Sequence, residues 1–206
     1  MYVHFFKRLL DLLISLLALI LLSPLFLILA ILIRLDSKGP VFFRQKRVGK
    51  GKKYFNILKF RTMYADAPHD IPTHLLSDPE AYHTRVGKLL RRTSLDELPQ
   101  LLNILAGQMS IIGPRPALWN QDDLIAARDL YGANDVMPGL TGWAQINGRD
   151  ELEIDEKAKL DGYYAQHISF PFDCRCFFGT FMAVLTHKGL VEGGTGTMHQ
   201  EQQDKE

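Results

Sequence analysis

The stretch from Leu9 to Ile33 reads LLDLLISLLALILLSPLFLILAILI, and it contains one acid, Asp11, and one proline, Pro24. As a helix, about 20 apolar residues with a rise of ~1.5 Å each are enough to cross the hydrocarbon of a bilayer. A proline inside a helix removes one backbone hydrogen bond and clashes with the preceding turn, which kinks the helix. The stretch therefore predicts a membrane helix that is kinked at Ser23 and Pro24.

Basic residues lie on both sides of this apolar stretch. Lys7 and Arg8 precede it, and residues 34–61 hold ten Lys or Arg and a single acid, Asp36. Because Lys and Arg next to a membrane segment favour the cytoplasmic side, a helical hairpin that enters and leaves the same leaflet accommodates both groups. A straight span would move one group across, and an ordinary signal anchor of this kind stays open as the second topology. A cleaved signal peptide is disfavoured, because no small-residue cleavage site follows the apolar run.

The basic segment 34–61 also indicates a partner. It directly follows the apolar anchor, and each cation near an anionic leaflet contributes about 1 kcal/mol of binding. A membrane surface is therefore a nearer partner for this charge than a nucleic acid. The sequence predicts membrane association and no nucleic-acid binding.

The rest of the chain is long enough for one domain with its own core, because about 170 of the 206 residues follow the membrane segment. Aromatic and β-branched runs at 41–48 and 53–60 flank a glycine-containing loop and predict a β-hairpin. Helices are predicted at 86–92, 101–107, 119–131, 153–166 and 172–188. The predicted fold class is α-rich α+β, with a re-entrant membrane helix hairpin at 1–35, a compact and mainly helical cytosolic domain at 36–190, and a disordered tail at 191–206.

Two adjacent acids, Asp96 and Glu97, are the main candidates for chemistry. One interpretation is structural: Ser94 begins a helix as its N-cap, and Glu97 completes a capping box three residues later. The other interpretation is catalytic. Adjacent residues on a helix point roughly 100° apart, so one carboxylate can attack a phosphorus atom while its neighbour binds Mg²⁺ together with substrate phosphates. The residues alone leave both interpretations open.

A diphosphate substrate needs cations near these acids. Arg115 lies between Pro114 and Pro116, which restrict its backbone and allow its planar guanidinium to face phosphate oxygens. Lys59 and Arg61, at the end of the second predicted strand, are further candidates. Each cation also has a simpler interpretation: Arg115 can pair with a carboxylate or cap a helix, and Lys59 and Arg61 can be solvated at a strand edge.

Seven short motifs occur in order along the chain, and together they are highly specific. They are KRLLD at 7–11 with SP at 23–24, KFRTM at 59–63, RTSLDELPQ at 92–100, MSIIGPRP at 109–116, PGLTG at 138–142, QINGR at 145–149 and DGYY at 161–164. On these motifs the chain resembles the bacterial sugar transferase family, the small monotopic phosphoglycosyl transferases that act on polyprenyl phosphate. The resemblance covers the chain from Lys7 to His187.

The resemblance implies a role for each candidate residue. Asp96 would be the nucleophile, and Glu97 would help to bind Mg²⁺. The apolar helix would be re-entrant, with its break at Ser23 and Pro24. Substrate binding is expected from Lys59, Arg61, Arg115, Arg149 and Asp161. Within this group, Arg149 would lie in the nucleotide-binding region.

The activity implied by the resemblance is transfer of a sugar 1-phosphate from a UDP-sugar to undecaprenyl phosphate, with release of UMP. The reaction would be ping-pong, through a phosphosugar-aspartate intermediate, at the cytoplasmic face of the bacterial inner membrane. Two alternatives stay open: a non-catalytic module that binds anionic lipid and uses Asp96 and Glu97 as a helix cap, and a bitopic enzyme whose N-terminus lies outside the cytoplasm. The sequence identifies neither the sugar nor the glycoconjugate pathway, and it leaves a homodimer open.

Overall fold

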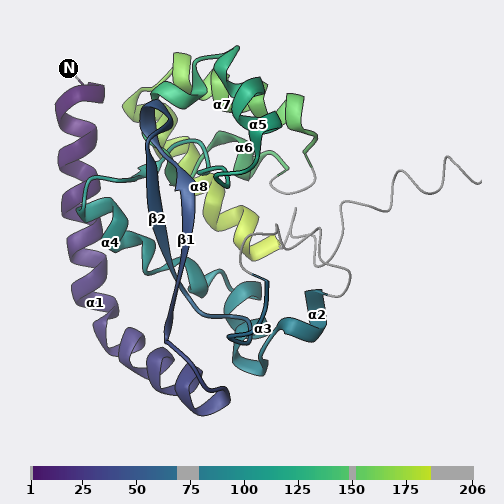
Figure 1. Ribbon diagram of the computed structural model, residues 1–206. Helices are drawn as coiled ribbons and strands as arrows, with labels where there is room; N and C mark the ends of the chain where they lie inside the picture. The colour runs from purple at the N-terminus through teal and green to yellow at the C-terminus, as the bar shows by residue number, and fades with distance from the viewer. Residues whose placement is uncertain (1, 69–78, 149–151, 187–206) are drawn as a thin grey trace, which may run out of the picture.

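The computed structural model describes residues 2–68, 79–148 and 152–186 (Figure 1). Its helices are α1 (Lys7–Asp36), α2 (Pro79–Tyr82), α3 (Arg85–Arg92), α4 (Gln100–Leu105), α5 (Asp122–Asp129), α6 (Trp143–Ile146), α7 (Ile154–Gln166) and α8 (Phe170–Thr186). Its strands are β1 (Phe42–Val48), β2 (Tyr54–Phe60), β3 (Ser110–Ile112) and β4 (Gly139–Thr141). The described fold is therefore mostly helical with a short β-hairpin, which confirms the predicted fold class of the domain.

The hairpin of β1 and β2 is built from the two predicted aromatic and β-branched runs. Phe42 pairs with Phe60 and Val48 pairs with Tyr54, so the predicted strand ends are correct to within one residue. α4 packs against both β2 and α1 (Figure 1). The Asn103 side chain of α4 accepts a hydrogen bond from the backbone N–H of Leu58 at 2.9 Å, and this contact holds α4 to the hairpin.

α1 is one continuous helix, although it contains Pro24. Pro24 has no N–H to donate to the carbonyl of Ile20, and the Ser23 hydroxyl donates to that carbonyl instead, at 2.8 Å. Figure 1 shows the axis of α1 changing direction towards its C-terminal end. The predicted re-entrant hairpin is therefore not confirmed: the helix bends without a break, and its membrane topology stays a prediction.

One stripe of α1 packs on the rest of the domain. Lys7, Asp11 and Ser15 are buried, and their spacing of four residues places them on one helix face. Lys7 Nζ lies 2.6 Å from Asp173 Oδ2 of α8, and Asp11 Oδ1 accepts from the N–H of Ile111 at 2.9 Å. The helix is long and apolar enough to cross a membrane, and 11% of its most apolar 18-residue stretch is buried. Its apolar residues therefore mostly face away from the domain.

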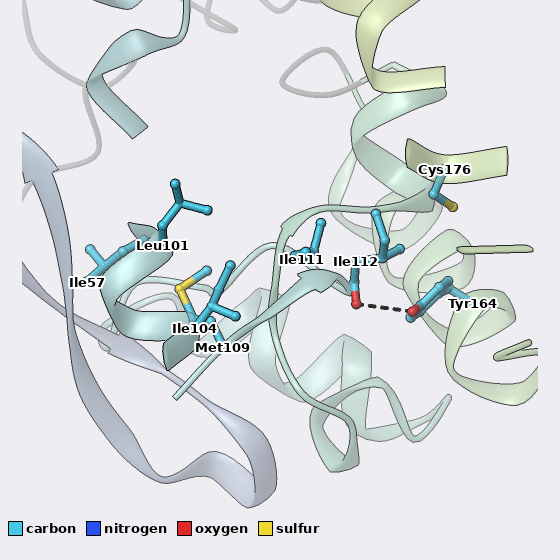
Figure 2. Close-up of a cluster of buried hydrophobic side chains, with 8 residues drawn as sticks. All are labelled: Ile57, Leu101, Ile104, Met109, Ile111, Ile112, Tyr164 and Cys176. Carbon is cyan, nitrogen blue, oxygen red and sulfur yellow. Dashed lines mark hydrogen bonds between the residues drawn. The ribbon is translucent and has the colours of Figure 1, made fainter. Parts of the chain in front are cut away.

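The main core lies between the hairpin, α4, β3, α7 and α8. Its buried side chains are Ile57, Leu101, Ile104, Met109, Ile111, Ile112, Tyr164 and Cys176 (Figure 2). The Tyr164 hydroxyl donates to the carbonyl of Ile112 at 3.1 Å, so the polar atom of this buried ring is satisfied. Each large apolar side chain buried here contributes about 1.5–3 kcal/mol. The core thus fixes α4 and β3, the elements on either side of the candidate site.

The parallel pairing of β3 with β4 is a feature that the sequence analysis did not predict. Ser110 pairs with Gly139, and Ile112 pairs with Thr141. A Cβ atom at Gly139 would lie 2.1 Å from the backbone N of Gly113, so the close approach requires glycine at position 139. The N–H of Gly139 also donates to the carbonyl of Pro114 at 2.8 Å. The pairing therefore fixes the backbone of the segment that carries Arg115.

The predicted helices are present, with shifted ends. Residues 86–92 and 153–166 form α3 and α7 to within one residue, whereas 119–131 is too long a prediction for α5. Residues 101–107 correspond to α4, which is followed by Gly107 at φ +81°, a conformation that terminates a helix. The prediction for 172–188 corresponds to α8, which begins at Phe170. Residues 187 and 188 and the predicted tail at 191–206 lie outside the described residues.

Candidate active site

Asp96 and Glu97 lie in a short 3-10 turn, η4 (Leu95–Glu97), which follows α3. Ser94 precedes the turn in the left-handed conformation, with φ 57° and ψ 16°, and its side chain makes no capping hydrogen bond. The next helix, α4, begins after Pro99 and also has no side-chain cap. The capping-box interpretation is therefore wrong, because the left-handed backbone at Ser94 does not place its hydroxyl on the first turn.

The Glu97 carboxylate joins two cations that come from distant parts of the chain. Lys59 of β2 donates to Oε1 at 3.0 Å, and the Arg115 guanidinium donates to both oxygens, with Nη1 at 3.2 Å from Oε2. Burial lowers the pKa of Lys59, and the negative charge of Glu97 opposes that effect. The structure thus brings three of the predicted site residues into one charged group.

Asp96 lies beside this charged group, but no hydrogen-bond donor of the described residues contacts its carboxylate. The residue is 6% exposed, and within the described residues its carboxylate accepts no hydrogen bond. Lys59 Nζ is 3.9 Å from Oδ2, which is an ion pair without a hydrogen bond. Burial raises the pKa of Asp96, and Lys59 partly offsets this effect. A carboxylate that no donor holds keeps its lone pairs available for nucleophilic attack.

Asp96 also lines a cavity of about 390 Å³ that is rich in basic side chains. The cations that line this cavity are Arg44, Arg47, Lys59, Arg61 and Arg91. Several guanidinium groups around one concave surface favour phosphate oxygens, which guanidinium binds through paired hydrogen bonds. The cavity is therefore suited to a ligand with more than one phosphate, placed next to Asp96.

Arg47 is a site residue that the sequence analysis did not single out. Its guanidinium donates to the carbonyl of Pro116 at 3.0 Å, next to Arg115. Burial and the charge of Arg115 lower the pKa of Arg47, which is the effect expected where cations crowd together without enough negative charge. Strand alternation could have identified Arg47, because alternate residues of β1 point inward. This pattern was hidden because Arg47 lies within a long run of surface cations.

Arg61, a predicted substrate-binding residue, has structural partners. Its guanidinium donates to the carbonyls of Ser37 at 2.8 Å and Lys38 at 2.7 Å. These carbonyls follow the C-terminal end of α1, where free carbonyls favour a cation. Arg61 therefore links α1 to the hairpin, although it also lines the basic cavity.

The structure does not bring Asp161 to the group around Glu97. Asp161 lies on α7 and accepts from Arg128 Nε of α5 at 2.9 Å, and both side chains are almost fully buried. It lines neither the basic cavity nor the apolar cavity described below. Arg149 lies outside the described residues. The substrate-binding roles of Asp161 and Arg149 stay predictions.

The two acids offer part of the ligand set of a Mg²⁺ ion. Mg²⁺ usually takes one or two carboxylates and completes its shell with water and substrate phosphates. Among the described residues, no group of three acidic, His or Cys side chains gathers that could hold a metal by itself. Asp96 has free carboxylate oxygens, and Glu97 is its neighbour in η4. These donors fit a Mg²⁺ ion that binds together with a phosphate ligand.

A sequence profile of the family described as bacterial sugar transferase matches residues 2–187. The chain belongs to the bacterial sugar transferase family. The matched range of this sugar transferase includes the turn with Asp96 and Glu97, both of their cationic partners, and the whole of α1.

Curated relatives of this sugar transferase include proteins that are named for different sugars. The chain is 40% identical over 186 residues to the sugar transferase EpsL of Bacillus subtilis, covering 90% of each chain. It is 39% identical over 190 residues to the UDP-glucose:undecaprenyl-phosphate glucose-1-phosphate transferase of Escherichia coli, covering 88% of this chain and 40% of the relative. It is 40% identical over 191 residues to the UDP-N-acetylgalactosamine-undecaprenyl-phosphate N-acetylgalactosaminephosphotransferase of Aeromonas hydrophila, covering 90% of this chain and 45% of the relative. Since the last two identities are nearly equal, overall similarity does not identify the sugar.

Proposed function

We propose that this sugar transferase moves a sugar 1-phosphate from a UDP-sugar to undecaprenyl phosphate and releases UMP. The names of the relatives support this reaction class. The observation that carries the proposal is the buried Asp96 carboxylate, which accepts no hydrogen bond in the described part of the chain and faces a cavity lined by cations. An unengaged carboxylate next to a phosphate-binding surface is suited to attack phosphorus.

In the first step, an Asp96 oxygen attacks the β-phosphorus of the UDP-sugar. A new bond forms between that oxygen and phosphorus, and the bond from phosphorus to the bridging oxygen breaks, so UMP leaves with the electron pair. In the second step, an oxygen of undecaprenyl phosphate attacks the same phosphorus, and the bond to Asp96 breaks. The products are undecaprenyl-diphospho-sugar and the original carboxylate.

Glu97 acts by holding the cations. Its contacts with Lys59 and Arg115 orient both positive groups beside Asp96, where they lower the repulsion between the carboxylate and the phosphates. A Mg²⁺ ion held by Glu97 together with phosphate oxygens would neutralise further charge. The alternative of a non-catalytic lipid-binding module has less support, since it uses the two acids as a helix cap and no cap is formed.

The proposal places the site at a membrane surface. α1 is apolar and long enough to cross a bilayer, and the cations of residues 34–61 follow it directly. Anionic headgroups attract such a segment, which supports a position of the domain on the cytoplasmic face, where the nucleotide donor is available. A lipid-borne phosphate and a soluble nucleotide would then meet at the same turn.

The test is UMP release by the purified full chain in detergent, with undecaprenyl phosphate, Mg²⁺ and a panel of UDP-sugars. Lipid-dependent release with one sugar, abolished in Asp96→Asn, is the expected result. Without lipid, a ping-pong enzyme releases at most one UMP per active site and carries a phosphosugar adduct that intact mass detects. Equal release by wild type and Asp96→Asn would remove Asp96 from the mechanism, and no release with any UDP-sugar would contradict the proposed donor.

A further inference from the structure

A second cavity, of about 410 Å³, lies between α1 and α8 and reaches Glu97 in η4, which we call the catalytic turn. Its apolar wall is formed by Ile14, Ala18 and Leu22 of α1 with Phe177 and Phe181 of α8. Leu101 and Ile111, two residues of the main core that Figure 2 shows, also line it. Because α1 is the helix that is apolar enough to cross a membrane, one wall of this cavity belongs to the membrane segment.

The charged residues of this cavity lie in or beside the turn with Asp96 and Glu97, whereas the hydroxyls of Thr141 and Thr180, which also line it, are paired with each other at 2.8 Å. Ser94 and Glu97 come from the catalytic turn, and Arg115 pairs with Glu97. Gln145 of α6 lies close to the segment that carries Arg115, because a Cβ at Gly142 would be 3.0 Å from Gln145 Oε1 and 2.1 Å from the backbone O of Gly113. The cavity is therefore amphiphilic, with a charged end at the dyad and an apolar body along α1 and α8.

Two polar side chains of the cavity have no partner among the described residues. Ser94 Oγ is buried without a hydrogen bond, and so are both Oε1 and Nε2 of Gln145. Gln145 is 9% exposed. Buried polar groups in proteins are nearly always paired, since an unpaired one destabilises the fold. Unpaired donors that line a cavity indicate a ligand that supplies acceptor oxygens.

We propose that this cavity binds the polyprenyl phosphate acceptor. The first isoprene units lie against α1 and α8, and the phosphate lies at the polar end, where Arg115, the Gln145 amide and the Ser94 hydroxyl donate to its oxygens. The inference rests on the proposed function and adds the acceptor site and two positioning residues, Ser94 and Gln145. The remainder of the long chain stays in the bilayer beside α1.

Each of the two cavities suits a different substrate of the proposed reaction. Asp96 lines the basic cavity, and its neighbour Glu97 lines the apolar one. A nucleoside diphosphate matches the cations of the first cavity, whereas apolar helix faces with one charged end match an amphiphile. The nucleotide donor would then reach the turn with Asp96 and Glu97 through the basic cavity, and the lipid acceptor would reach it through the apolar cavity beside α1.

The first test is Gln145→Leu, which removes the unpaired amide and keeps an apolar side chain of similar size. A hydrogen bond to a charged group corresponds to about a tenfold change in affinity or more. We therefore expect the ratio of the KM for undecaprenyl phosphate to the KM for the UDP-sugar to rise about tenfold. A purely structural role for Gln145 would leave this ratio unchanged.

Gln100→Leu is the matched control. Gln100 Nε2 is also buried without a partner among the described residues, but Gln100 does not line the apolar cavity. Loss of an unpaired amide should have a similar small effect on the unfolding temperature at both positions. An equal rise of the KM ratio in both variants would contradict the proposal, because the effect would then not depend on the cavity.

The second test does not depend on turnover or on the folding of a variant. A polyprenyl phosphate with a diazirine in its first isoprene units is photolysed with the wild-type full chain in detergent. We expect label in residues 14–22 and 177–183, with loss of that label when unmodified undecaprenyl phosphate is added. Label spread evenly along α1, or label that undecaprenyl phosphate does not displace, would overturn the acceptor site.

The two tests separate this inference from the proposed function. If labelling is specific but no UDP-sugar releases UMP, the acceptor site is supported and the proposed reaction fails. If UMP release depends on undecaprenyl phosphate but the label is not displaced, the reaction is supported and the acceptor site fails.

Discussion

The Arg115 guanidinium and the Glu97 carboxylate form a bidentate pair, with Nη1 3.2 Å from Oε2 and Nη2 bonded to Oε1. Lys59 donates to the same Oε1 at 3.0 Å, so one carboxylate orients two cations. The three residues come from β2, from η4 and from the segment after β3. The pair therefore links the parts of the fold that surround Asp96, and its geometry is specific to a planar guanidinium.

Arg115→Lys tests this geometry. Lysine keeps the charge but has no planar fork, so it cannot donate to both Glu97 oxygens and also face a phosphate. We expect kcat/KM for the UDP-sugar to fall about 10²-fold, the usual effect of removing one donor that stabilises transition-state charge. Arg85→Lys, at an exposed position at the start of α3, is the control and should not change kcat/KM. Equal activity of the two variants would contradict the role of the fork.

Asp96→Asn and Glu97→Gln should differ in their effect on stability. The ionised Asp96 is buried without a hydrogen bond from the described residues, so a neutral amide should leave the free energy of unfolding unchanged or raise it while activity is lost. Glu97→Gln leaves Lys59 and Arg115 close together without their counter-charge and should lower it by about 1–3 kcal/mol. Thermal unfolding in detergent measures both. Similar losses of stability in the two variants would show that Asp96 contributes to the fold like Glu97.

The raised pKa of Asp96 predicts a pH dependence with a definite sign. Burial raises this pKa in the folded chain, so the folded state binds a proton more readily than the unfolded state, where Asp titrates near ~3.9. The associated stability is fully present below ~3.9 and is lost as the pH rises through the higher folded value. The unfolding temperature of Asp96→Asn relative to wild type should therefore increase with pH across this window and then stay constant. Melting curves of both proteins between pH 4 and pH 8 measure the difference, and a difference that is independent of pH would contradict the raised pKa.

The same pKa shift predicts the pH profile of the reaction. Because the ionised carboxylate is the nucleophile, kcat/KM should fall on the acid side at a pH above the ordinary Asp value of ~3.9. Initial rates of UMP release between pH 4 and pH 8 locate this limb. A limb at or below the ordinary value would show that the reacting carboxylate is not the buried one.

The parts of the fold that follow local rules were predicted from the sequence. The hairpin was found because its two runs flank a short glycine loop, and the predicted ranges of α3 and α7 were correct to within one residue. The pairing of β3 with β4 was missed because each strand has three residues and the contact joins distant segments. Helix ends were less accurate: α5 runs from Asp122 to Asp129, whereas the predicted range was 119–131.

The candidate site shows the same division between local and tertiary information. The motif pattern identified Asp96, Glu97, Lys59 and Arg115, and the structure brings these four together. The motif pattern could not show that Arg47 lies beside them, because strand alternation was hidden within a run of cations. A left-handed backbone is uncommon for a residue other than glycine, and Ser94 adopts it, so the choice between a helix cap and a catalytic role for Asp96 and Glu97 needed the structure.

Ser23→Ala should weaken α1 more than Ser15→Ala does. The Ser23 hydroxyl donates to the Ile20 carbonyl that Pro24 leaves without a donor, and an apolar environment offers no water to replace it. Its loss should cost about 1 kcal/mol. Ser15 Oγ is buried without a partner among the described residues, so its removal should be neutral or stabilising. Unfolding midpoints in detergent compare the two variants, and equal midpoints would show that the Ser23 hydrogen bond contributes nothing.

Pro24→Ala tests the membrane topology of α1. Alanine restores the N–H that Pro24 lacks and removes the clash that bends the helix, so a straight span becomes accessible and the N-terminus can cross. We expect a cysteine at the exposed Val3 to resist a membrane-impermeant maleimide from the periplasm in the Pro24 chain and to react in Pro24→Ala. Reaction in both chains would identify a straight anchor, and reaction in neither would show that Pro24 does not set the topology.

The docking contacts of α1 oppose this movement, which gives the Pro24→Ala experiment a second arm. Lys7 Nζ is 2.6 Å from Asp173 Oδ2, and Arg8 donates to the carbonyl of Ile104 at 2.7 Å, so the N-terminal half of α1 is tied to the domain. Breaking a buried ion pair by removing one partner costs about 3–5 kcal/mol, which makes release of the helix easier. Asp173→Asn combined with Pro24→Ala should therefore increase the labelling of Val3→Cys beyond Pro24→Ala alone. Asp173→Asn alone should leave Val3→Cys unlabelled, because the bend at Pro24 still returns the helix to the same leaflet.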